Sequence, residues 1–413
     1  MERARRATPI ASELLDGFRA LVVNGPRQSG KSTLLRQLQS DRGGLVANLD
    51  DPAMLGAATS DPIGFLDSLP TGVAIDEFQR GGPQLLLALK MRLDASRDVG
   101  QYVLAGSTRF LSMRHIGETL TGRIGITELL PLSAGEIRGR REDFVDRAFA
   151  GGLLDHRAEA LTRTDYAQAV TVGGFPEVAL GPATTRFRSS WCDSYLRTVT
   201  AVANVEQVAE IRRPQLIAGL VEQLAARSSG EVVVADLARE LNAGAQLVTS
   251  YLDVLATLYL IRLLPAWTTS RINRSKRRPV VHMIDSALAA HLVGETVDDL
   301  ARPGSRWFGP LLESYVVGEI AKQAAWAERP VALSHYRDRD QREVDLVLER
   351  GREVVAVEVK ATSTPAASHA RHLAYLRDRI GDRFRGGIVL HTGNQRVPLG
   401  DRLCAVPVSS LWA

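Results

Sequence analysis

A run of residues near the start of the chain has the glycine and lysine spacing that binds phosphate groups. It reads Gly25-Pro26-Arg27-Gln28-Ser29-Gly30-Lys31-Ser32, with Thr33 next. The apolar residues 20–23 before it predict a buried strand, and the leucines at 34, 35 and 38 predict one face of a helix. Such a loop offers backbone N–H groups and a helix N-terminus to phosphates. We therefore expect residues 25–33 to contact a nucleoside triphosphate, with Lys31 at its β- and γ-phosphates and Ser32 on Mg²⁺.

Two acids and a serine end the following apolar runs. Residues 72–75 lead to Asp76 and Glu77, and residues 102–106 lead to Ser107. In P-loop ATPases the first acid orders magnesium and the second polarises the attacking water, so we assign Asp76 and Glu77 these roles. We expect Ser107 to touch the γ-phosphate or hold the water; an ordinary turn serine is the alternative. Strands and helices in this order predict a parallel sheet with its ligand at the carboxyl ends of the strands.

Several motifs together resemble one family. They are GPRQSGKSTLL, NLDDP, AIDEFQR, LAGSTRF, TGRIGITELLPLS and GGFPE, in this order. The series resembles a bacterial group of AAA+ ATPases related to the archaeal ATPases, and the resemblance covers nearly the whole chain. It implies a nucleotide core, a helical lid with a winged-helix segment, and a nuclease-like C-terminal domain.

Two further site residues follow from that resemblance. Arg123, in Thr-Gly-Arg, is expected to reach the γ-phosphate of a neighbouring subunit as an arginine finger. A structural salt bridge is the alternative. Pro176, in Gly-Gly-Phe-Pro-Glu, is expected to contact the adenine from the lid, with an ordinary loop as the alternative.

The middle of the chain has the pattern of a winged helix. Residues 234–241 and 246–258 predict two helices around the turn 242–244, and residues 260–264 and 280–284 predict the strands that follow. Between those strands lie five basic residues: Arg271, Arg274, Lys276, Arg277 and Arg278. Such a loop is suited to hold nucleic-acid phosphates without reading sequence. A lid or a protein contact is the alternative role for this segment.

A predicted hairpin near the C-terminus carries two acids and a lysine. Residues 343–348 and 353–359 predict its strands, and a turn at 350–351 would pair Asp345 with Ala356. That register places Asp345, Glu358 and Lys360 on one face, with the two acids as diagonal neighbours about 7 Å apart. The spacing is close enough for both acids to share a metal ion.

This hairpin resembles the PD-(D/E)xK nuclease fold. The resemblance implies that Asp345 and Glu358 bind magnesium and that Lys360 steadies the attacking water or the transition-state charge. Glu313, in the helical segment 311–322, matches the acid that such folds supply from their first helix. A buried lysine–carboxylate pair and an inactive remnant that only holds DNA are the alternatives.

Length and composition bound the class of protein. The 413 residues suggest two to four domains, and 45% apolar with 24% charged residues is ordinary for a globular protein. No apolar run is long enough to span a membrane. Cys192 and Cys404 are too few for a disulfide framework, so a reducing cytoplasm is expected. The five lysines are scarce beside arginine, and two of them, Lys31 and Lys360, fall in the strongest motifs.

These observations predict an α/β protein with a P-loop AAA+ parallel sheet core, a helical lid and winged helix, and a small PD-(D/E)xK-like α/β domain. The expected boundaries are 1–135, 136–204, 205–300 and 301–413. The expected activity is ATP hydrolysis with Mg²⁺ coupled to DNA handling, in a homo-oligomer. A signalling switch driven by ATP, or a defence or toxin effector with a conditional nuclease, are the alternatives.

Overall fold

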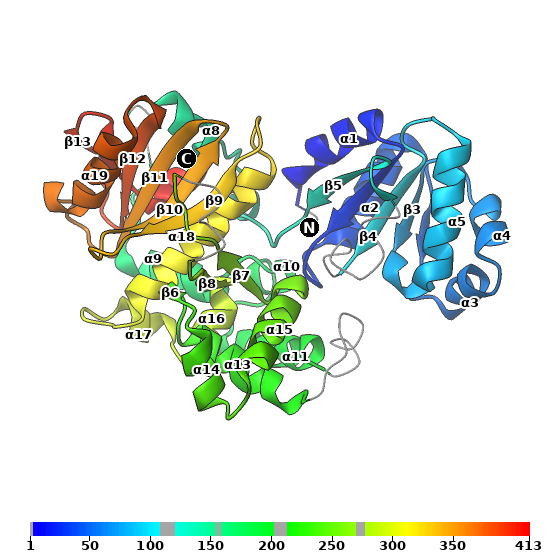
Figure 1. The fold of residues 1–413 in the computed structure, drawn as a ribbon, viewed down its shortest axis with the longest axis horizontal. Coiled ribbons are helices and arrows are strands. Elements are labelled where there is room, and N and C mark those ends of the chain that lie inside the picture. The colour runs from blue at the N-terminus through cyan, green and yellow to red at the C-terminus, as the bar shows by residue number, and fades with distance from the viewer. Residues whose placement is uncertain (1–2, 108–119, 153, 155–157, 202–212, 270–276) are drawn as a thin grey trace. The chain divides into compact units, whose positions relative to one another are not determined.

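The computed structural model describes residues 3–107, 120–152, 154, 158–201, 213–269 and 277–413. The chain divides into two compact units, residues 1–131 with 257–259, and residues 132–256 with 260–413. Each unit is described separately below (Figure 1). Among the described residues, every helix is too short or too polar to cross a lipid bilayer.

The first unit is built on a five-stranded parallel sheet with the order β2-β3-β4-β1-β5. The strands are β1 (Ala20–Asn24), β2 (Val46–Asn48), β3 (Val73–Asp76), β4 (Tyr102–Gly106) and β5 (Ile124–Glu128). The register pairs Asn24 with Gly106 and with Glu128, so these strands end at the same edge. Strand β4 lies between β3 and β1, which brings the tips of β3 and β4 beside the loop that follows β1.

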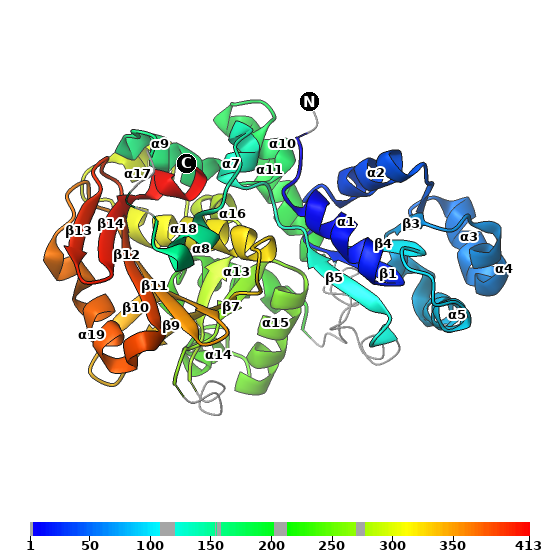
Figure 2. The same cartoon turned by 90° about the horizontal axis from the view of Figure 1, so that it is seen from above.

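Helices cover both faces of this sheet (Figure 2). They are α1 (Ala7–Gly17), α2 (Lys31–Arg42), α3 (Pro52–Ser60), α4 (Pro62–Ser68) and α5 (Gly82–Ala95), with the short 3₁₀ turn η1 (Phe78–Gly81). In β1, Leu21 and Val23 pack with α1 and α2, whereas Ala20 and Val22 pack with α3, α4 and α5. This two-residue alternation in an all-apolar strand is the signature of a sheet buried on both faces.

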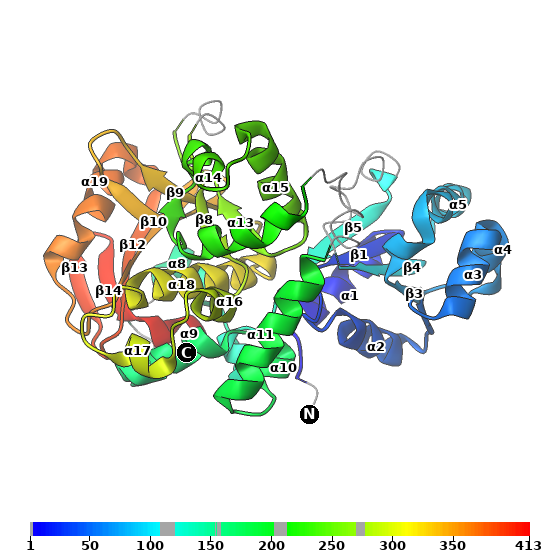
Figure 3. The same ribbon diagram turned by 90° about the horizontal axis from the view of Figure 1, so that it is seen from below.

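The second unit begins with helices. They are α7 (Ala134–Arg138), α8 (Phe144–Ala150), α9 (Arg163–Val172), α10 (Pro176–Ala179) and α11 (Thr185–Val199). Next come α13 (Gln215–Ala225), β6 (Gly230–Glu231), α14 (Val234–Glu240), α15 (Ala245–Thr257), β7 (Ile261–Leu264) and β8 (Val280–Met283). The three strands form an antiparallel sheet in the order β6-β8-β7 beside these helices (Figure 3). The two predicted helices and the strands after them are therefore present, while the winged-helix assignment stays a prediction.

The C-terminal part of this unit is a six-stranded mixed sheet with the order β13-β14-β12-β11-β10-β9. Its strands are β9 (Ala332–Arg337), β10 (Glu343–Arg350), β11 (Glu353–Lys360), β12 (Phe384–His391), β13 (Val397–Gly400) and β14 (Leu403–Pro407). Its helices are α16 (Ser286–Leu292), α17 (Val297–Ala301), α18 (Phe308–Ala325) and α19 (Arg371–Ile380), with 3₁₀ turns η4 (Ala367–Ala370), η5 (Gly381–Arg383) and η6 (Val408–Trp412). The parallel core followed by a separate mixed sheet confirms the predicted α/β class.

Candidate functional site

The loop after β1 has a backbone shape that only small or tolerant residues permit. Gly30 (φ 95°) precedes α2 as its N-cap, and Gln28 also has a positive φ of 61°. A Cβ on Gly25 would lie 2.2 Å from the Leu129 carbonyl oxygen, so this position requires glycine. The loop thus curls back over the N-terminus of a 12-residue helix, which is an anion-binding arrangement.

Lys31 lies inside this loop. Its side chain is buried, and Nζ donates hydrogen bonds to the carbonyl oxygens of Gly25 (3.1 Å) and Pro26 (2.8 Å). Burial lowers the pKa of Lys31 to about 8, although the charges of Glu77 and Asp76 act to raise it. In its described hydrogen bonds the Lys31 ammonium group contacts neutral carbonyl groups and no carboxylate. Its charge is therefore available to bind phosphate oxygens.

The tips of β3 and β4 bring the predicted acids and serine together. Asp76 is buried at the end of β3, and its Oδ1 accepts from the Glu77 N–H (3.0 Å). Ser107 Oγ, just after β4, donates to Glu77 Oε2 (3.2 Å). Glu77 has a left-handed φ of 51°, a strained conformation of the kind found at functional sites. The predicted juxtaposition of Glu77 and Ser107 is therefore present.

The residues at this edge fit a nucleotide with magnesium. The Ser29 hydroxyl and Asn24 Oδ1 are buried and have no hydrogen-bond partner among the described residues. Buried polar atoms are rarely left in this state, so a ligand or water is their expected partner. Ser32 is exposed at the start of α2, where its hydroxyl is accessible, and Asp76 offers a carboxylate. Hydroxyl and carboxylate oxygens are suitable Mg²⁺ ligands.

Arg123 lies at the amino end of β5, whereas Lys31 follows the carboxyl end of β1. The register pairs Ala20 with Ile124, so Arg123 is at the opposite edge of the sheet from the phosphate loop. Its guanidinium binds Asp94 through Nε–Oδ1 (2.5 Å) and Nη2–Oδ2 (3.1 Å). The alternative of a structural ion pair is thus observed, and a finger role toward another subunit stays a prediction.

The glycine-rich segment before Pro176 has a structural role in the second unit. A Cβ on Gly173 (φ 65°) would lie 1.8 Å from Asp285 Oδ1, so glycine is required there. The Gly174 N–H donates to Asp285 Oδ2 (2.8 Å), and Pro176 is the first residue of α10. The adenine contact predicted for Pro176 stays a prediction.

The predicted basic loop is only partly described. Arg271, Arg274 and Lys276 lie outside the described residues. Arg277 and Arg278 are exposed, but the Arg277 side chain donates to the Arg337 carbonyl of β9, and the Arg278 carbonyl contacts His335 Nε2 (3.1 Å). One end of the loop is therefore fixed on β9, and its DNA-binding role stays a prediction.

The register of the C-terminal hairpin differs from the predicted one. Arg350 pairs with Glu353 and Leu346 with Val357, so one step further Asp345 faces Glu358 directly instead of diagonally. The turn is residues 351–352, because Gly351 (φ 64°) takes the first turn position, as in a type II′ turn. The register is shifted by two residues, and side chains alternate between the two faces with the same period. Asp345, Glu358 and Lys360 therefore still share one face, as predicted.

The acids of this hairpin act on one another. Burial raises the pKa of Asp345 to about 8, and the charge of Glu358 adds to the rise. Burial also raises the pKa of Glu313, on α18, with the charges of Asp345 and Glu358 contributing. Lys360 Nζ donates to Glu358 Oε1 (2.6 Å), and the Val359 N–H donates to Asp345 Oδ2 (2.7 Å). These three carboxyl groups lie near one lysine, so acidic side chains outnumber basic ones among the residues named here.

The side chains of this hairpin fit a metal ion only in part. Within the described residues, no three acidic, histidine or cysteine side chains are arranged to hold an ion. Lys360 occupies one Glu358 oxygen, as the alternative of a lysine–carboxylate pair requires. The other oxygen, Oε2, is buried without a hydrogen-bond partner among the described residues. The donor set therefore fits a divalent cation only if the Lys360 side chain or the acids adjust.

Sequence reasoning missed several residues around these sites. Arg5 is buried and donates to the Ser29 carbonyl of the phosphate loop (2.6 Å). Gln79 contacts both Glu77 and Ser107. The Ser229 hydroxyl, before β6, donates to the Pro310 carbonyl of α18 (2.8 Å) and acts to lower the pKa of Glu313. Only Gln79 had a usable signal, its position two residues after the predicted acid pair.

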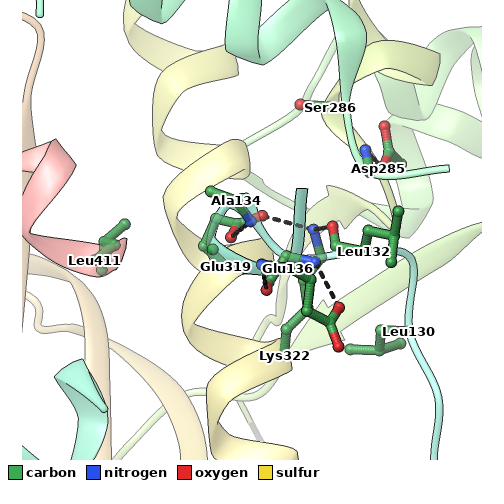
Figure 4. Close-up of polar contacts among 12 residues, drawn as sticks. Leu130, Leu132, Ala134, Glu136, Asp285, Ser286, Glu319, Lys322 and Leu411 are labelled. Atoms are coloured by element: carbon green, nitrogen blue, oxygen red, sulfur yellow. Dashed lines mark hydrogen bonds and ion pairs between the residues drawn. The ribbon is translucent and has the colours of Figure 1, made fainter. Parts of the chain in front are cut away.

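A buried charged network in the second unit was also missed (Figure 4). Lys322 of α18 donates to Glu319 Oε1 (2.6 Å) and to the Leu132 carbonyl (2.9 Å), and Glu319 Oε2 accepts from the Ala134 N–H (2.7 Å). Glu142 accepts from the Gly135 N–H (2.8 Å). Burial raises the pKa of Glu142 to about 8, with the charge of Glu319 contributing.

Comparison with known families matches three segments of the chain. Residues 17–138 match a family described as an AAA domain. The first unit contains an AAA-type P-loop ATPase domain. Residues 163–299 match a "Domain of unknown function (DUF8612)", and residues 308–411 match a "Domain of unknown function (DUF4143)".

Similar whole chains are distant. An uncharacterized protein of Mycobacterium tuberculosis and one of Mycobacterium bovis are each 26% identical over 393 residues, 95% of this chain and 80% of theirs. A Walker-type ATPase of Pyrococcus abyssi has a TM-score of 0.46 at 15% identity, covering 71% of this chain and 98% of that one. The RuvB Holliday junction branch migration motor of Thermotoga maritima has a TM-score of 0.32 at 19% identity, covering 64% and 90%. Scores this low carry no argument about activity.

Proposed function

We propose that this protein binds and hydrolyses ATP with Mg²⁺ and uses the cycle to act on DNA through its second unit. The observation that carries the ATP part is the single sheet edge at which Lys31, Asp76, Glu77 and Ser107 meet. The AAA match over residues 17–138 supports it.

Each residue at that edge has a distinct part in hydrolysis. Lys31 leaves the loop carbonyls and binds the β- and γ-phosphates. Ser32 and Asp76 hold Mg²⁺, which neutralises charge on the phosphate oxygens. Glu77 accepts the proton of the attacking water, and Ser107 holds the Glu77 carboxylate in place.

The DNA part of the proposal rests on the middle region. Its helices and strands follow the predicted order, and Arg277 and Arg278, the last residues of the predicted basic loop, are exposed. Arginine side chains bind phosphate oxygens through several N–H groups at once, which suits them to a DNA backbone.

A second candidate activity, metal-dependent cleavage of DNA, is favoured by the buried Glu358 Oε2, which has no hydrogen-bond partner in the described part of the chain. Asp345 and Glu358 would hold the cation, with Glu313 nearby. Such an ion activates water and polarises the phosphoryl oxygen. Lys360 would steady the negative charge on the phosphate or orient the water.

The test is ATP turnover with and without DNA, beside cleavage assays with magnesium and manganese. Turnover that DNA stimulates supports the proposal. The absence of turnover with MgATP would overturn it. Assembly driven by nucleotide without DNA affinity would support a signalling switch, and cleavage that appears only after assembly would support a defence effector.

The proposed homo-oligomer has its own test in Arg123. Arg123→Ala should lower hydrolysis far more than nucleotide affinity, on the order of 10³-fold if the finger acts on a neighbouring subunit. Mixing it with Glu77→Gln should restore some turnover at mixed interfaces. Failure of this rescue, with a monomer by light scattering, would leave Arg123 as the observed partner of Asp94.

A further inference from the structure

The side chain of Gln79 lies between the two residues that follow β3 and β4. It belongs to η1, the 3₁₀ turn that begins directly after Glu77. Its amide nitrogen donates to Glu77 Oε2 and to Ser107 Oγ (3.2 Å), while Ser107 Oγ donates to the same Glu77 oxygen (3.2 Å). An amide has two N–H donors and both are used, so Glu77 and Ser107 fix which way the amide faces.

Glu77 lies close enough to the phosphate loop for its charge to act on Lys31. Among the charges that act on Lys31, that of Glu77 has the largest effect, ahead of that of Asp76. Both described hydrogen bonds from side chains to Glu77 reach Oε2. Among these described contacts, Oε1 of Glu77 remains available to accept a proton from water.

Gln79 has one more polar atom, the amide oxygen Oε1. Oε1 of Gln79 is buried and accepts no hydrogen bond from any described residue. A buried acceptor without a donor is unfavourable, so native proteins rarely retain one without a ligand or water beside it. A water molecule placed to attack the γ-phosphate has two hydrogens and needs two acceptors.

We propose that Gln79 is a catalytic residue of the ATPase site: it holds the Glu77 carboxylate in position and accepts one hydrogen of the attacking water. The other hydrogen faces Glu77. The water oxygen bonds to the γ-phosphorus as the bond from phosphorus to the β–γ bridging oxygen breaks. ADP leaves with that electron pair, and the proton of the water passes to Glu77. This role rests on the proposed ATP hydrolysis.

The main test is Gln79→Ala, measured with MgATP for turnover and with a fluorescent ATP analogue for binding. We expect kcat to fall on the order of 10²-fold, within the range of a lost proton-transfer or water contact, while the nucleotide Kd changes less than about threefold. Gln79→Glu keeps the size and one acceptor oxygen but removes the donor and repels Glu77, so it should lose at least as much. Gln84→Ala, an exposed glutamine on α5, is the control and should match the parent.

A double variant separates this role from a structural one. If Gln79 acts together with Glu77 on one water, adding Gln79→Ala to Glu77→Gln should lower the residual rate by less than about threefold, because the two effects are not additive. Parent-like or faster turnover in a folded Gln79→Ala protein would overturn the inference, as would full additivity with Glu77→Gln. A parent protein that never hydrolyses ATP would instead overturn the proposed function.

Discussion

The phosphate loop and the C-terminal hairpin each combine a lysine with carboxylates, but their charges are arranged in opposite ways. Lys31 donates to two backbone carbonyl oxygens, and burial lowers its pKa to about 8. Lys360 is bound to Glu358, and although burial acts to lower its pKa, the charge and hydrogen bond of Glu358 together with the charges of Asp345 and Glu313 give a net rise.

The difference indicates which ion each site is ready to receive. A buried lysine whose described hydrogen bonds go to carbonyl groups is stabilised by a bound anion, so the first site favours phosphate. Carboxyl groups whose pKa values are raised by burial and by one another are stabilised by a cation beyond the single lysine. In the hairpin Lys360 already supplies one positive charge to these acids, so the same residue type has different partners in the two sites.

The largest expected effect is that of replacing Lys31 on ATP binding. Lys31→Ala should weaken ATP binding roughly 10²-fold or more, because it removes a charged hydrogen-bond donor to the phosphates. Titration calorimetry with the matched variant Lys90→Ala, on α5, as control measures this. Equal affinity in Lys31→Ala and the parent would remove the contrast between the two lysines.

The pH dependence of ATP binding sharpens the same point. Because the pKa of Lys31 is lowered to about 8 in the free protein, part of the population lacks the proton above that pH. Phosphate favours the charged form, so binding near pH 8 should take up protons, and affinity should fall as pH rises above 8. Calorimetry in two buffers of different ionisation enthalpy counts the protons; no uptake would contradict the assignment.

The hairpin should respond in the opposite sense. Asp345→Asn should weaken Mn²⁺ binding about 10-fold or more, whereas Lys360→Ala should not weaken it. The pKa of Asp345 is raised to about 8, so protons compete with the metal and parental Mn²⁺ affinity should increase as pH rises through 8. ATP turnover should stay near the parent level in both variants. Equal Mn²⁺ affinity in Asp345→Asn and the parent would favour the lysine–carboxylate pair alone.

A smaller effect is expected at Glu142, which lies beside the buried network of Glu319 and Lys322 and whose carboxyl group has a raised pKa. Glu142 (pKa about 8, usual value 4.5) binds its proton more tightly in the folded state. Its contribution to stability is complete below pH 4.5 and is lost as pH rises through 8. In Glu142→Gln, Tm should decline less between pH 5 and 9 than it does in the parent. The difference should be about 2–4 °C for each kcal/mol of change in the free energy of unfolding. Glu222→Gln, exposed on α13, should leave the pH profile unchanged.

The smallest effect concerns the basic loop. Arg277→Ala or Arg278→Ala should each reduce the salt dependence of DNA binding by about one unit of slope, and adding Arg274 and Lys276 should extend this to a few units. Fluorescence anisotropy at several salt concentrations measures the slope. An unchanged slope would make the loop a solvated segment or a protein contact.

The residues that could be predicted from the sequence are those fixed by local pattern. The order of strand, glycine loop and helix placed Lys31, and strand ends placed Asp76, Glu77 and Ser107 at one edge. Alternation on β11 placed Glu358 and Lys360 on one face even though the register was wrong by two residues. The error came from the turn, where the single glycine at 351 takes the first position and not the second.

The missed residues depend on contacts that no local pattern encodes. Glu142 and Glu319 are far apart in the chain and meet only because α18 packs against the segment before α7. Gln79 is close to Glu77 in sequence, but its contact requires the left-handed Glu77 backbone and the turn η1. A helical or extended continuation would have pointed it elsewhere.

The hydrogen bonds that hold residues 132–135 in the buried charged network determine with which part of the chain these residues unfold. The amide hydrogens of Ala134 and Gly135 are buried against Glu319 and Glu142, although they follow β5 by only a few residues. Local unfolding occurs in cooperative segments, and an amide exchanges with deuterium only when its own segment opens. These two amides should therefore exchange at the rate of α18 and not at that of β5. Between Glu128 and Ala134 the chain passes from a segment that unfolds with β5 to one that unfolds with α18. Unfolding of the parallel sheet should therefore leave the amides of the second unit protected from exchange.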